Sequence, residues 1–246
     1  MPNRTSLCAA LGALLIAATW GFLVLARPAS WDSLAAGGAP ALFTLAGYVG
    51  GTLLIVAAAL PTIPARALPI IPVGLVLNIA VGQVVGFTGL PLYLDAVGTV
   101  LIAVLMGPLV GAATGGLSSV VWGLMNPAAL PFAAVSAAIG ALAGWAARLG
   151  AFDKVWRALL AGAVTGIVGG VLAAPVAAFV YGGTAGVGTG AVVAALSAMG
   201  HSLLASVTMQ SMISDPLDKA LVFLLVLAVL RALPERVRRG IRGTSE

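Results

Sequence analysis

Eight long apolar runs constrain this chain more than any other feature of its sequence. They cover residues 7–26, 40–60, 70–86, 92–106, 109–124, 130–148, 156–181 and 217–233. A helix that crosses a bilayer needs about 20 mostly apolar residues. Strands of a membrane barrel instead alternate apolar and polar residues in segments of about ten, and these runs do not alternate. The sequence therefore predicts an all-α membrane protein, a polytopic helical bundle of about eight transmembrane helices.

The shortage of charge excludes several soluble classes. Charged residues make up 8% of the chain, whereas soluble domains contain about 25%. So few charges cannot cover a water-facing surface, which excludes an ordinary soluble enzyme and a nucleic-acid-binding domain. The net charge of +5 is explained by the Lys and Arg that collect in cytoplasmic loops. The single Cys8 excludes an internal disulfide and a cysteine-rich metal site, so we expect no metal and no cofactor.

The polar stretch 188–213 decides the topology. If it spans the membrane, the two ends of the chain lie on opposite sides. If it does not, only Arg27 and Lys219 lie outside, and ten of the twelve Lys and Arg lie inside: Arg4, Arg66, Arg148, Lys154, Arg157, Arg231, Arg236, Arg238, Arg239 and Arg242. The positive-inside rule favours the second arrangement. We therefore expect a multi-pass protein of the plasma membrane, with both termini cytoplasmic and 188–213 as a re-entrant outer segment.

Glycines recur at intervals of four residues in three of the apolar runs. These series are Gly107, Gly111, Gly115 with Ser119 and Gly123; Gly140 with Gly144; and Gly162, Gly166 with Gly170. Such spacing forms a smooth stripe on a helix and predicts close helix packing in lipid. A second reading is that one stripe slides against a partner protein. The turn Gly107-Pro108 predicts a tight hairpin between two spans.

With this orientation, polar side chains from many spans gather toward the outer side. Buried polar groups are expensive in a bilayer and tend to mark a site. Hydrogen-bonding residues beside Trp and Tyr suit a small organic ligand of mixed polarity. The candidate ligand-binding residues are Asn78, Gln83, Tyr93, Asp95, Trp122, Asn126, His201 and Gln210.

Several of these residues also have a structural interpretation. Asp95 can interact with the positive end of a helix, His201 can be a hydrogen-bonded structural residue, and Trp122 can anchor the membrane interface. The sequence Ser214-Asp215-Pro216 predicts the start of a helix, because proline is favoured in the first turn. Asp218 and Lys219 follow it and would form an ion pair at the outer interface.

No catalytic motif accompanies these residues. The chain lacks His-Glu-x-x-His, Gly-x-Ser-x-Gly, Cys-x-x-Cys and the Gly-Lys-Ser/Thr of a nucleotide-binding loop, so we expect neither an enzyme nor a motor of its own. Ion-coupled carriers usually bury charged groups at mid-membrane, and apart from Asp218 at the start of the last run, Asp95 is the one acidic residue within the predicted core spans.

The stretch 73–124 carries a resemblance to a known family. It reads VGLVLNIAVGQVVGFTGLPLYLDAVGTVLIAVLMGPLVGAATGGLSSVVWGL. It resembles the first half of the substrate-binding (S) components of energy-coupling factor (ECF) vitamin transporters. The shared features are an Asn in the first helix (Asn78), the Leu-Pro-x-Tyr-Leu-Asp-x-x-Gly-Thr entry to the second (90–99) and the Gly-Pro-Leu-x-Gly hairpin (107–111). The end of the chain, from Ser214 through Leu233-Pro234, is similar to the family's final helix.

The resemblance covers about residues 67–240 and implies a fold and a function. It implies a six-span core at 67–246 and a vitamin-sized pocket on the outer side. The two-span hairpin predicted at 1–66 is a departure, because it is additional to the family's six-helix core. It implies a membrane-embedded substrate-binding subunit of an ECF-type ABC importer, which hands a vitamin-like molecule to a transmembrane coupling subunit and two ATPases. The alternatives are a sensory or scaffolding membrane module that works through a partner, and a standalone secondary carrier.

The resemblance has one departure that concerns partner docking. The family commonly uses an Ala-xxx-Ala stripe on its first core helix to contact the coupling subunit. This chain has Gly74, Asn78 and Gly82 there instead, while Ala9, Ala13 and Ala17 form such a stripe on the first of the two additional spans.

Overall fold

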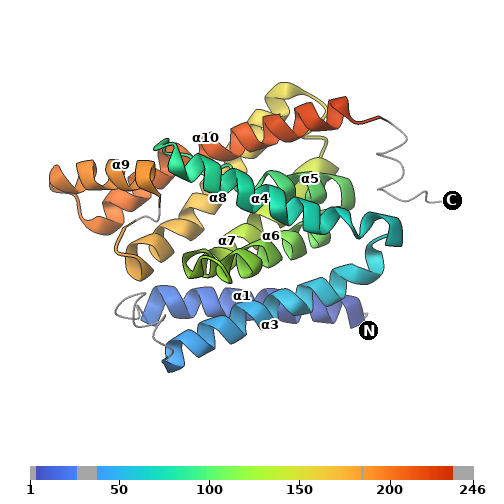
Figure 1. Cartoon of the computed structure of the whole chain (residues 1–246), viewed down its shortest axis with the longest axis horizontal. Helices are drawn as coiled ribbons and strands as arrows, with labels where there is room; N and C mark the ends of the chain where they lie inside the picture. Colours follow the sequence, from blue (N-terminus) through green and yellow to red (C-terminus); the bar gives the residue numbers. More distant parts are fainter. Residues whose placement is uncertain (1–3, 27–37, 184–185, 235–246) are drawn as a thin grey trace.

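The computed structural model describes residues 4–26, 38–183 and 186–234, and within these ranges the chain is helical without a strand (Figure 1). The longer helices are α1 (Arg4–Ala26), α3 (Ala39–Ala59), α4 (Ile70–Phe87), α5 (Val97–Met106), α6 (Pro108–Gly123), α7 (Ala133–Arg148), α8 (Val155–Val180), α9 (Val187–Ala198) and α10 (Leu203–Ala232). Short 3₁₀ turns lie at Leu60–Thr62 (η1), Ala65–Ala67 (η2) and Pro127–Phe132 (η3). The predicted all-α class is confirmed.

Five helical segments of the described chain are long and apolar enough to cross a membrane. They are Arg4–Ala26, Ala39–Thr62, Ala65–Phe87, Pro127–Arg148 and Val155–Val180. The remaining predicted spans correspond to α5 with 10 residues, α6 with 16 residues, and α10, which carries several charged side chains. The protein is thus a helical membrane protein, and the predicted count of eight spans stays a prediction.

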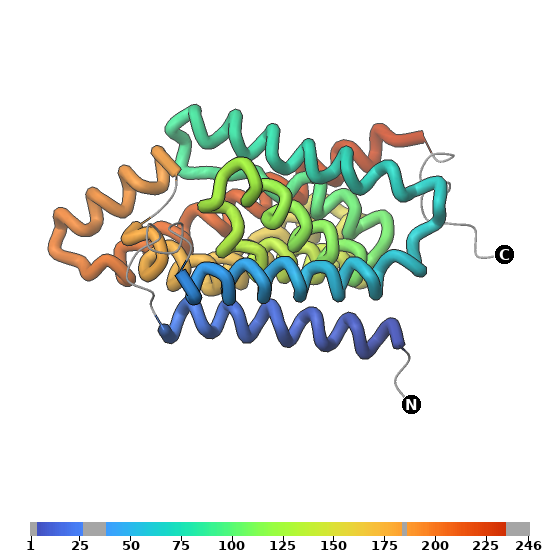
Figure 2. Tube along the Cα trace, turned by 60° about the horizontal axis from the view of Figure 1, so that its bottom comes forward, coloured from blue at the N-terminus to red at the C-terminus, as the bar shows by residue number. Residues whose placement is uncertain are grey.

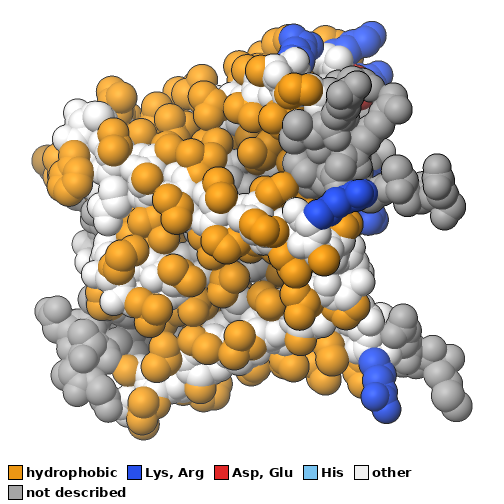
Figure 3. Space-filling model, turned by 45° about the vertical axis from the view of Figure 1, so that its right-hand side comes forward, with side chains coloured by type: hydrophobic (Ala, Val, Ile, Leu, Met, Phe, Trp, Pro, Cys, Tyr) orange, Lys and Arg blue, Asp and Glu red, His pale blue; other side chains and the backbone are white. Residues whose placement is uncertain are grey.

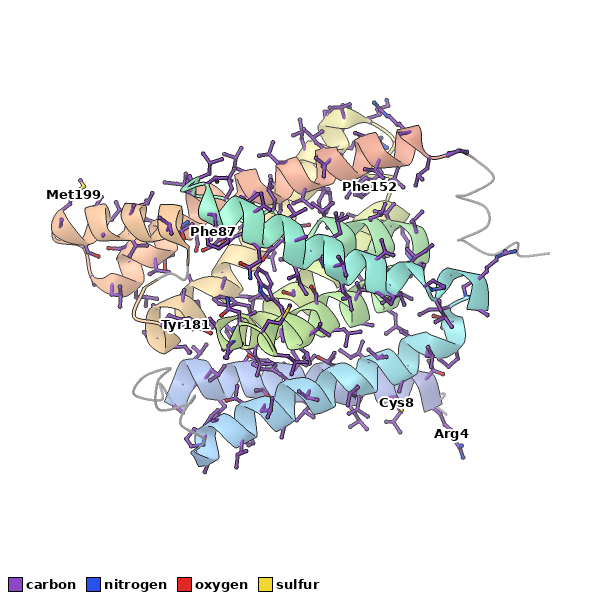
Figure 4. The ribbon with its side chains drawn as sticks, viewed as in Figure 1. Arg4, Cys8, Phe87, Phe152, Tyr181 and Met199 are labelled. Carbon is purple, nitrogen blue, oxygen red and sulfur yellow. The ribbon has the colours of Figure 1, made fainter. Side chains whose placement is uncertain are left out.

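The bundle has two chemically different ends. The α1 residue Arg4 and the α7–α8 loop residue Phe152 lie at one end, whereas Phe87, Tyr181 and Met199 lie at the other (Figure 4). The visible Lys and Arg side chains gather along the first of these ends (Figure 3), which we call the basic end. The helix α1 begins there and α10 ends there (Figure 1). Of the residues used to predict the topology, Arg27, Arg236, Arg238, Arg239 and Arg242 lie outside the described residues.

The first two long helices form a hairpin along one flank of the bundle (Figure 2). The helices α1 and α3 approach closely at glycines, because a Cβ atom on Gly12 would lie 2.6 Å from the carbonyl oxygen of Gly51. The hairpin packs on α6 and α8, and the indole nitrogen of Trp20 donates a hydrogen bond of 2.9 Å to the carbonyl oxygen of Leu172. The apolar core of the hairpin is therefore continuous with that of the remaining helices.

The predicted glycine stripes are helix-packing surfaces. Between α6 and α7, a Cβ on Gly115 would lie 2.0 Å from the carbonyl oxygen of Ser136, and one on Gly140 would lie 2.0 Å from that of Gly111. Between α8 and α10, a Cβ on Gly166 would lie 2.2 Å from the carbonyl oxygen of Asp215. Any side chain would push these backbones apart, so the packing interpretation of the stripes is confirmed. The predicted tight hairpin is confirmed as well, since Gly107 alone separates α5 from α6.

The last helix differs from the prediction. The predicted helix start at Ser214 is wrong, because α10 begins at Leu203, with the Ser202 hydroxyl accepting a hydrogen bond from the Ala205 N–H at 3.3 Å. The helix then continues through Pro216 without interruption. Tertiary packing explains this outcome: the glycine face of α8 packs against this part of α10, and proline within a membrane helix is tolerated when neighbouring helices pack around it. The stretch 188–213 is accordingly α9 plus the first turns of α10.

Candidate ligand-binding cavity

A cavity of about 290 Å³ lies within the half of the bundle farther from the basic end. Helices α4 to α10 and the segment before α5 all contribute to its wall. Its polar and aromatic lining residues are Gln83, Phe87, Tyr93, Asp95, Thr99, Ser118, Ser119, Trp122, Asn126, Phe132, Ser136, Gln210, Ser211, Asp215 and Lys219. The volume is near the lower end of the range for small-molecule sites, about 300–1,000 Å³.

Six of the eight candidate residues line this cavity. They are Gln83, Tyr93, Asp95, Trp122, Asn126 and Gln210. They come from three different helices, α4, α6 and α10, and two connecting segments. The structure thus brings together most of the residues that the sequence pattern selected, although they are spread over more than a hundred positions of the chain.

Asn78 lies behind the cavity wall. Its side chain is fully buried, and its Nδ2 atom donates to the hydroxyls of Thr99 (2.8 Å) and Ser118 (3.2 Å). Its Oδ1 atom accepts from the backbone N–H of Gly98 at 2.7 Å and of Thr99 at 3.2 Å. Two donors and two acceptor positions are therefore all used, and Asn78 connects α4 to α5 and α6. Its position indicates a structural role that fixes two cavity-lining hydroxyls.

His201 lies outside the cavity. It is exposed in the turn between α9 and α10 and is not among the lining residues. The sequence could not distinguish a turn here from the interior of a polar segment, because no apolar periodicity marks the boundary.

Buried charges form the most distinctive part of the wall. The Lys219 Nζ atom lies 2.6 Å from Oδ2 of Asp218 and 3.1 Å from Oδ1 of Asp95. The Lys219 side chain is 7% exposed and that of Asp218 is fully buried, whereas that of Asp95 is 33% exposed. The predicted ion pair between Asp218 and Lys219 is confirmed, but it is buried within the bundle instead of lying at the interface.

The second oxygen of Asp218 holds the segment before α5. Its Oδ1 atom accepts hydrogen bonds from the backbone N–H groups of Tyr93 and Leu94, both at 2.8 Å. Leu94 has a φ of +50°, a conformation that residues other than glycine rarely adopt. Two hydrogen bonds to a carboxylate stabilise this strained turn, which directs the Tyr93 and Asp95 side chains to the cavity.

The segment before α5 also meets α9. The Tyr93 hydroxyl and the Thr189 hydroxyl are 3.0 Å apart. A Cβ on Gly188 would lie 2.3 Å from the carbonyl oxygen of Gly89, so the two backbones are in direct contact. Since Tyr93 and Val187 both line the cavity, this contact forms part of its boundary.

Trp122 supplies an aromatic face and an unused donor. Its indole nitrogen is buried and makes no hydrogen bond within the described part of the chain. Buried donors are nearly always paired in native proteins, so this N–H is a candidate donor to a bound molecule. On another side of the cavity, Phe132 stacks on Tyr181 with ring centroids 5.7 Å apart, which fixes a second apolar surface.

Sequence reasoning missed Asp215 and Lys219 as site residues. Both were assigned to the start of a helix at the membrane interface. The signal that could have found them is the presence of charged side chains in an otherwise apolar stretch, which usually marks a functional position in membrane proteins. The hydroxyls of Ser119 and Ser136, which form a 2.8 Å hydrogen bond in the wall, carried no distinguishing signal.

The basic end holds a larger hollow of about 520 Å³. Its lining includes Arg148, Asp153 and Arg231, which are exposed, and the glycines Gly107 and Gly144. It lacks the buried charges and hydroxyls of the first cavity. Among the described residues, no group of three or more His, Cys, Asp or Glu side chains is arranged to bind a metal ion.

The comparisons with known proteins give no family assignment: no family model, no curated protein and no solved structure matches this chain. The chemistry of the cavity is therefore read from its own residues. It offers donors, acceptors, charged groups and aromatic faces to a small molecule.

Proposed function

We propose that this protein is a membrane-embedded substrate-binding subunit that captures a vitamin-like small molecule and passes it to an energising partner. The observation that carries the proposal is the cavity, in which polar, charged and aromatic groups from five helices and the adjoining segments surround a volume suited to a small molecule. Retaining these groups in an apolar bundle is costly unless they bind something or bind one another.

The partner in this proposal is the coupling subunit of an ECF-type ABC importer with its two ATPases. The resemblance of residues 67–240 to S components supports it, as does the lack of a nucleotide-binding motif in this sequence. In such an arrangement, this chain binds the substrate and the partners supply the energy, so no hydrolytic step is assigned to it.

The proposed topology has eight spans, with both termini in the cytoplasm of the cell and the cavity near the outer face of its plasma membrane. The five long apolar segments are then joined by α5, α6 and α10. Most residues of α5 are buried by protein, so a short helix there does not expose backbone polar groups to lipid. The basic end faces the cytoplasm, as expected from the positive-inside rule.

In this proposal, the coupling subunit does not dock on the stripe of α4, the first helix of the core. A Cβ on Gly82 of α4 would lie 2.8 Å from the Trp122 ring, and one on Gly74 would lie 2.3 Å from Ile102. The Gly74–Asn78–Gly82 face is therefore covered by this chain's own α5 and α6. The docking surface belongs to another helix, and the stripe of half-buried Ala9 with exposed Ala13 and Ala17 is a candidate.

A standalone secondary carrier is the second candidate. The observation that favours it is the buried network of Asp95, Asp218 and Lys219, since ion-coupled carriers place ionisable groups within the bilayer. The hydrogen bonds that Asp218 accepts from backbone N–H groups of the turn before α5 explain the same network as a structural support.

The two candidates differ in what drives uptake. The test is purification of the tagged protein from its native membrane in mild detergent, with identification of stoichiometric partners, followed by uptake assays in proteoliposomes. An ECF subunit copurifies with a membrane coupling protein and two ATPases, and its uptake requires ATP. Uptake by the protein alone, driven by an ion gradient, would overturn the subunit proposal. Copurification with a kinase or cyclase instead would favour the sensory alternative.

A further inference from the structure

The charges around the cavity do not balance. Three carboxylates, Asp95, Asp215 and Asp218, lie close enough to one another to interact electrostatically, and one ammonium, that of Lys219, accompanies them. Lys219 forms ion pairs with Asp95 and Asp218. The described part of the chain places no other Lys, Arg or His in the cavity lining.

Asp215 is the carboxylate that remains without an ion pair. It precedes Lys219 by one helical turn, yet the Lys219 ammonium pairs with Asp95 and Asp218 instead. Its side chain hydrogen-bonds with Ser211, the residue is 8% exposed, and it lines the cavity. A buried carboxylate held only by a neutral hydroxyl is destabilising in an apolar environment, unless a positive charge approaches it.

The neighbouring helix offers space to this carboxylate but no charge. On α8, a Cβ on Gly170 would lie 2.9 Å from Oδ2 of Asp215, and one on Gly166 would lie 2.2 Å from its carbonyl oxygen. The two glycines thus allow Asp215 to be buried beside α8, where the Lys219 ammonium interacts with it electrostatically but forms no ion pair with it. A positively charged group on a bound molecule would supply a closer partner for this carboxylate.

The remaining wall suits an organic cation better than a metal ion. Tyr93, Trp122 and Phe132 line the same cavity, and aromatic faces attract ammonium-type cations. No metal-binding group of His, Cys, Asp or Glu occurs among the described residues, and about 290 Å³ exceeds the space that a single ion occupies. The buried indole N–H of Trp122, which lacks an acceptor among the described residues, adds a place for a hydrogen-bond acceptor on the same molecule.

We propose that the cavity binds a small organic cation, whose ammonium-type group lies beside Asp215 and Asp95 and whose apolar or aromatic body lies against Trp122 and Phe132. This assignment rests on the proposed function as a small-molecule-binding protein and specifies the substrate class.

The test compares three probes of similar size and different charge: benzylamine, which is cationic at neutral pH, benzyl alcohol and benzoate. Binding to the full chain in lipid nanodiscs is measured by saturation-transfer NMR and equilibrium dialysis. We expect benzylamine to bind more tightly than the other two probes. Asp215→Asn, which preserves the shape of the side chain, is expected to weaken the affinity for benzylamine by about tenfold or more and to leave the affinity for benzyl alcohol unchanged.

The matched control is Asp153→Asn, which removes a carboxylate that is 70% exposed at the basic end and should leave all three affinities unchanged. If Asp215→Asn does not fold, Asp95→Asn applies the same test at the more exposed carboxylate. Preference for benzoate or benzyl alcohol, abolished by Trp122→Ala, would overturn the cation assignment and leave the binding function intact. Failure to bind any of the three probes would likewise overturn the cation assignment, while the binding function is tested separately by native mass spectrometry of the purified protein.

Discussion

The ammonium of Lys219 lies 3.1 Å from a carboxylate oxygen of Asp95, a residue 124 positions earlier in the chain. This contact joins α10 to the turn before α5. The neighbouring Asp218 carboxylate accepts hydrogen bonds from two backbone N–H groups of the same turn. The network therefore supports the fold and shapes the cavity wall at once, so that changes to it should affect both stability and binding.

Removing the central cation should destabilise the protein strongly. Lys219→Met keeps most of the side-chain volume but leaves Asp95 and Asp218 unpaired in the interior. Breaking a buried ion pair from one side costs about 3–5 kcal/mol in the free energy of unfolding. Lys154→Met, at an exposed position of the basic end, should change it by less than about 0.5 kcal/mol. Unfolding by a denaturing detergent measures both, and equal stabilities of the two variants would contradict the role given to the network.

Asn78 should matter for stability more than any exposed polar residue near the cavity. Asn78→Ala removes four hydrogen bonds and leaves buried partners unpaired, so we expect a loss of about 2–3 kcal/mol in the free energy of unfolding. His201→Ala should change neither stability nor ligand affinity, because His201 is exposed and outside the cavity. A thermal-unfolding series read by intrinsic fluorescence tests this contrast. A larger effect at His201 than at Asn78 would show that the site assignment is wrong.

The close approach of α6 and α7 should tolerate no side chain at Gly140. Its Cβ would lie 2.0 Å from the carbonyl oxygen of Gly111, so Gly140→Val should separate the helices and lower the unfolding free energy by about 3 kcal/mol or more. Gly21→Val is the matched control, since a Cβ on Gly21 meets nothing within 4 Å. The yield of monodisperse protein and its thermal midpoint report the effect. Normal yield and midpoint for Gly140→Val would contradict this packing.

The proposed topology can be tested by labelling single cysteines. In a Cys8→Ser background, the exposed positions Leu149 and Met199 are replaced one at a time by cysteine. Met199 lies at the end opposite Phe152 (Figure 4), and Leu149 is close to Phe152 in sequence. A membrane-impermeant maleimide should label Met199→Cys in intact cells and Leu149→Cys only after permeabilisation. The reverse pattern would show that the orientation is inverted. Labelling of both positions in intact cells would show that the two ends of the bundle do not lie on opposite sides of the membrane.

Patterns that depend on local spacing were predictable from the sequence. Long apolar runs predicted the helices, and the series from Gly107 to Gly123 predicted a packing surface, because every fourth residue falls on one helical face. The Gly107-Pro108 hairpin was also predictable, because glycine and proline affect the conformation of their own backbone. The gathering of polar side chains also followed from local information, once the orientation of each run was assumed.

Features that depend on contacts between distant segments were not predictable. Pro216 in α10 looked like a helix start, and only packing against the glycines of α8 shows why the helix continues through it. The reach of Lys219 to Asp95 is likewise a property of the packed bundle. Asn78 was selected because it is polar within an apolar run, but its four hydrogen bonds show that a buried amide can be satisfied entirely by the protein.

The central claim is that the cavity binds a small molecule, and native mass spectrometry of the gently purified protein tests it most directly. The wild-type protein should carry about one small molecule per chain, released and identified on activation, and Asp95→Ala/Trp122→Ala should lose it while remaining folded. A wild-type protein that is empty, and that also binds no member of a panel of vitamins and related compounds, would contradict the claim. The polar groups of the cavity would then serve the structure alone.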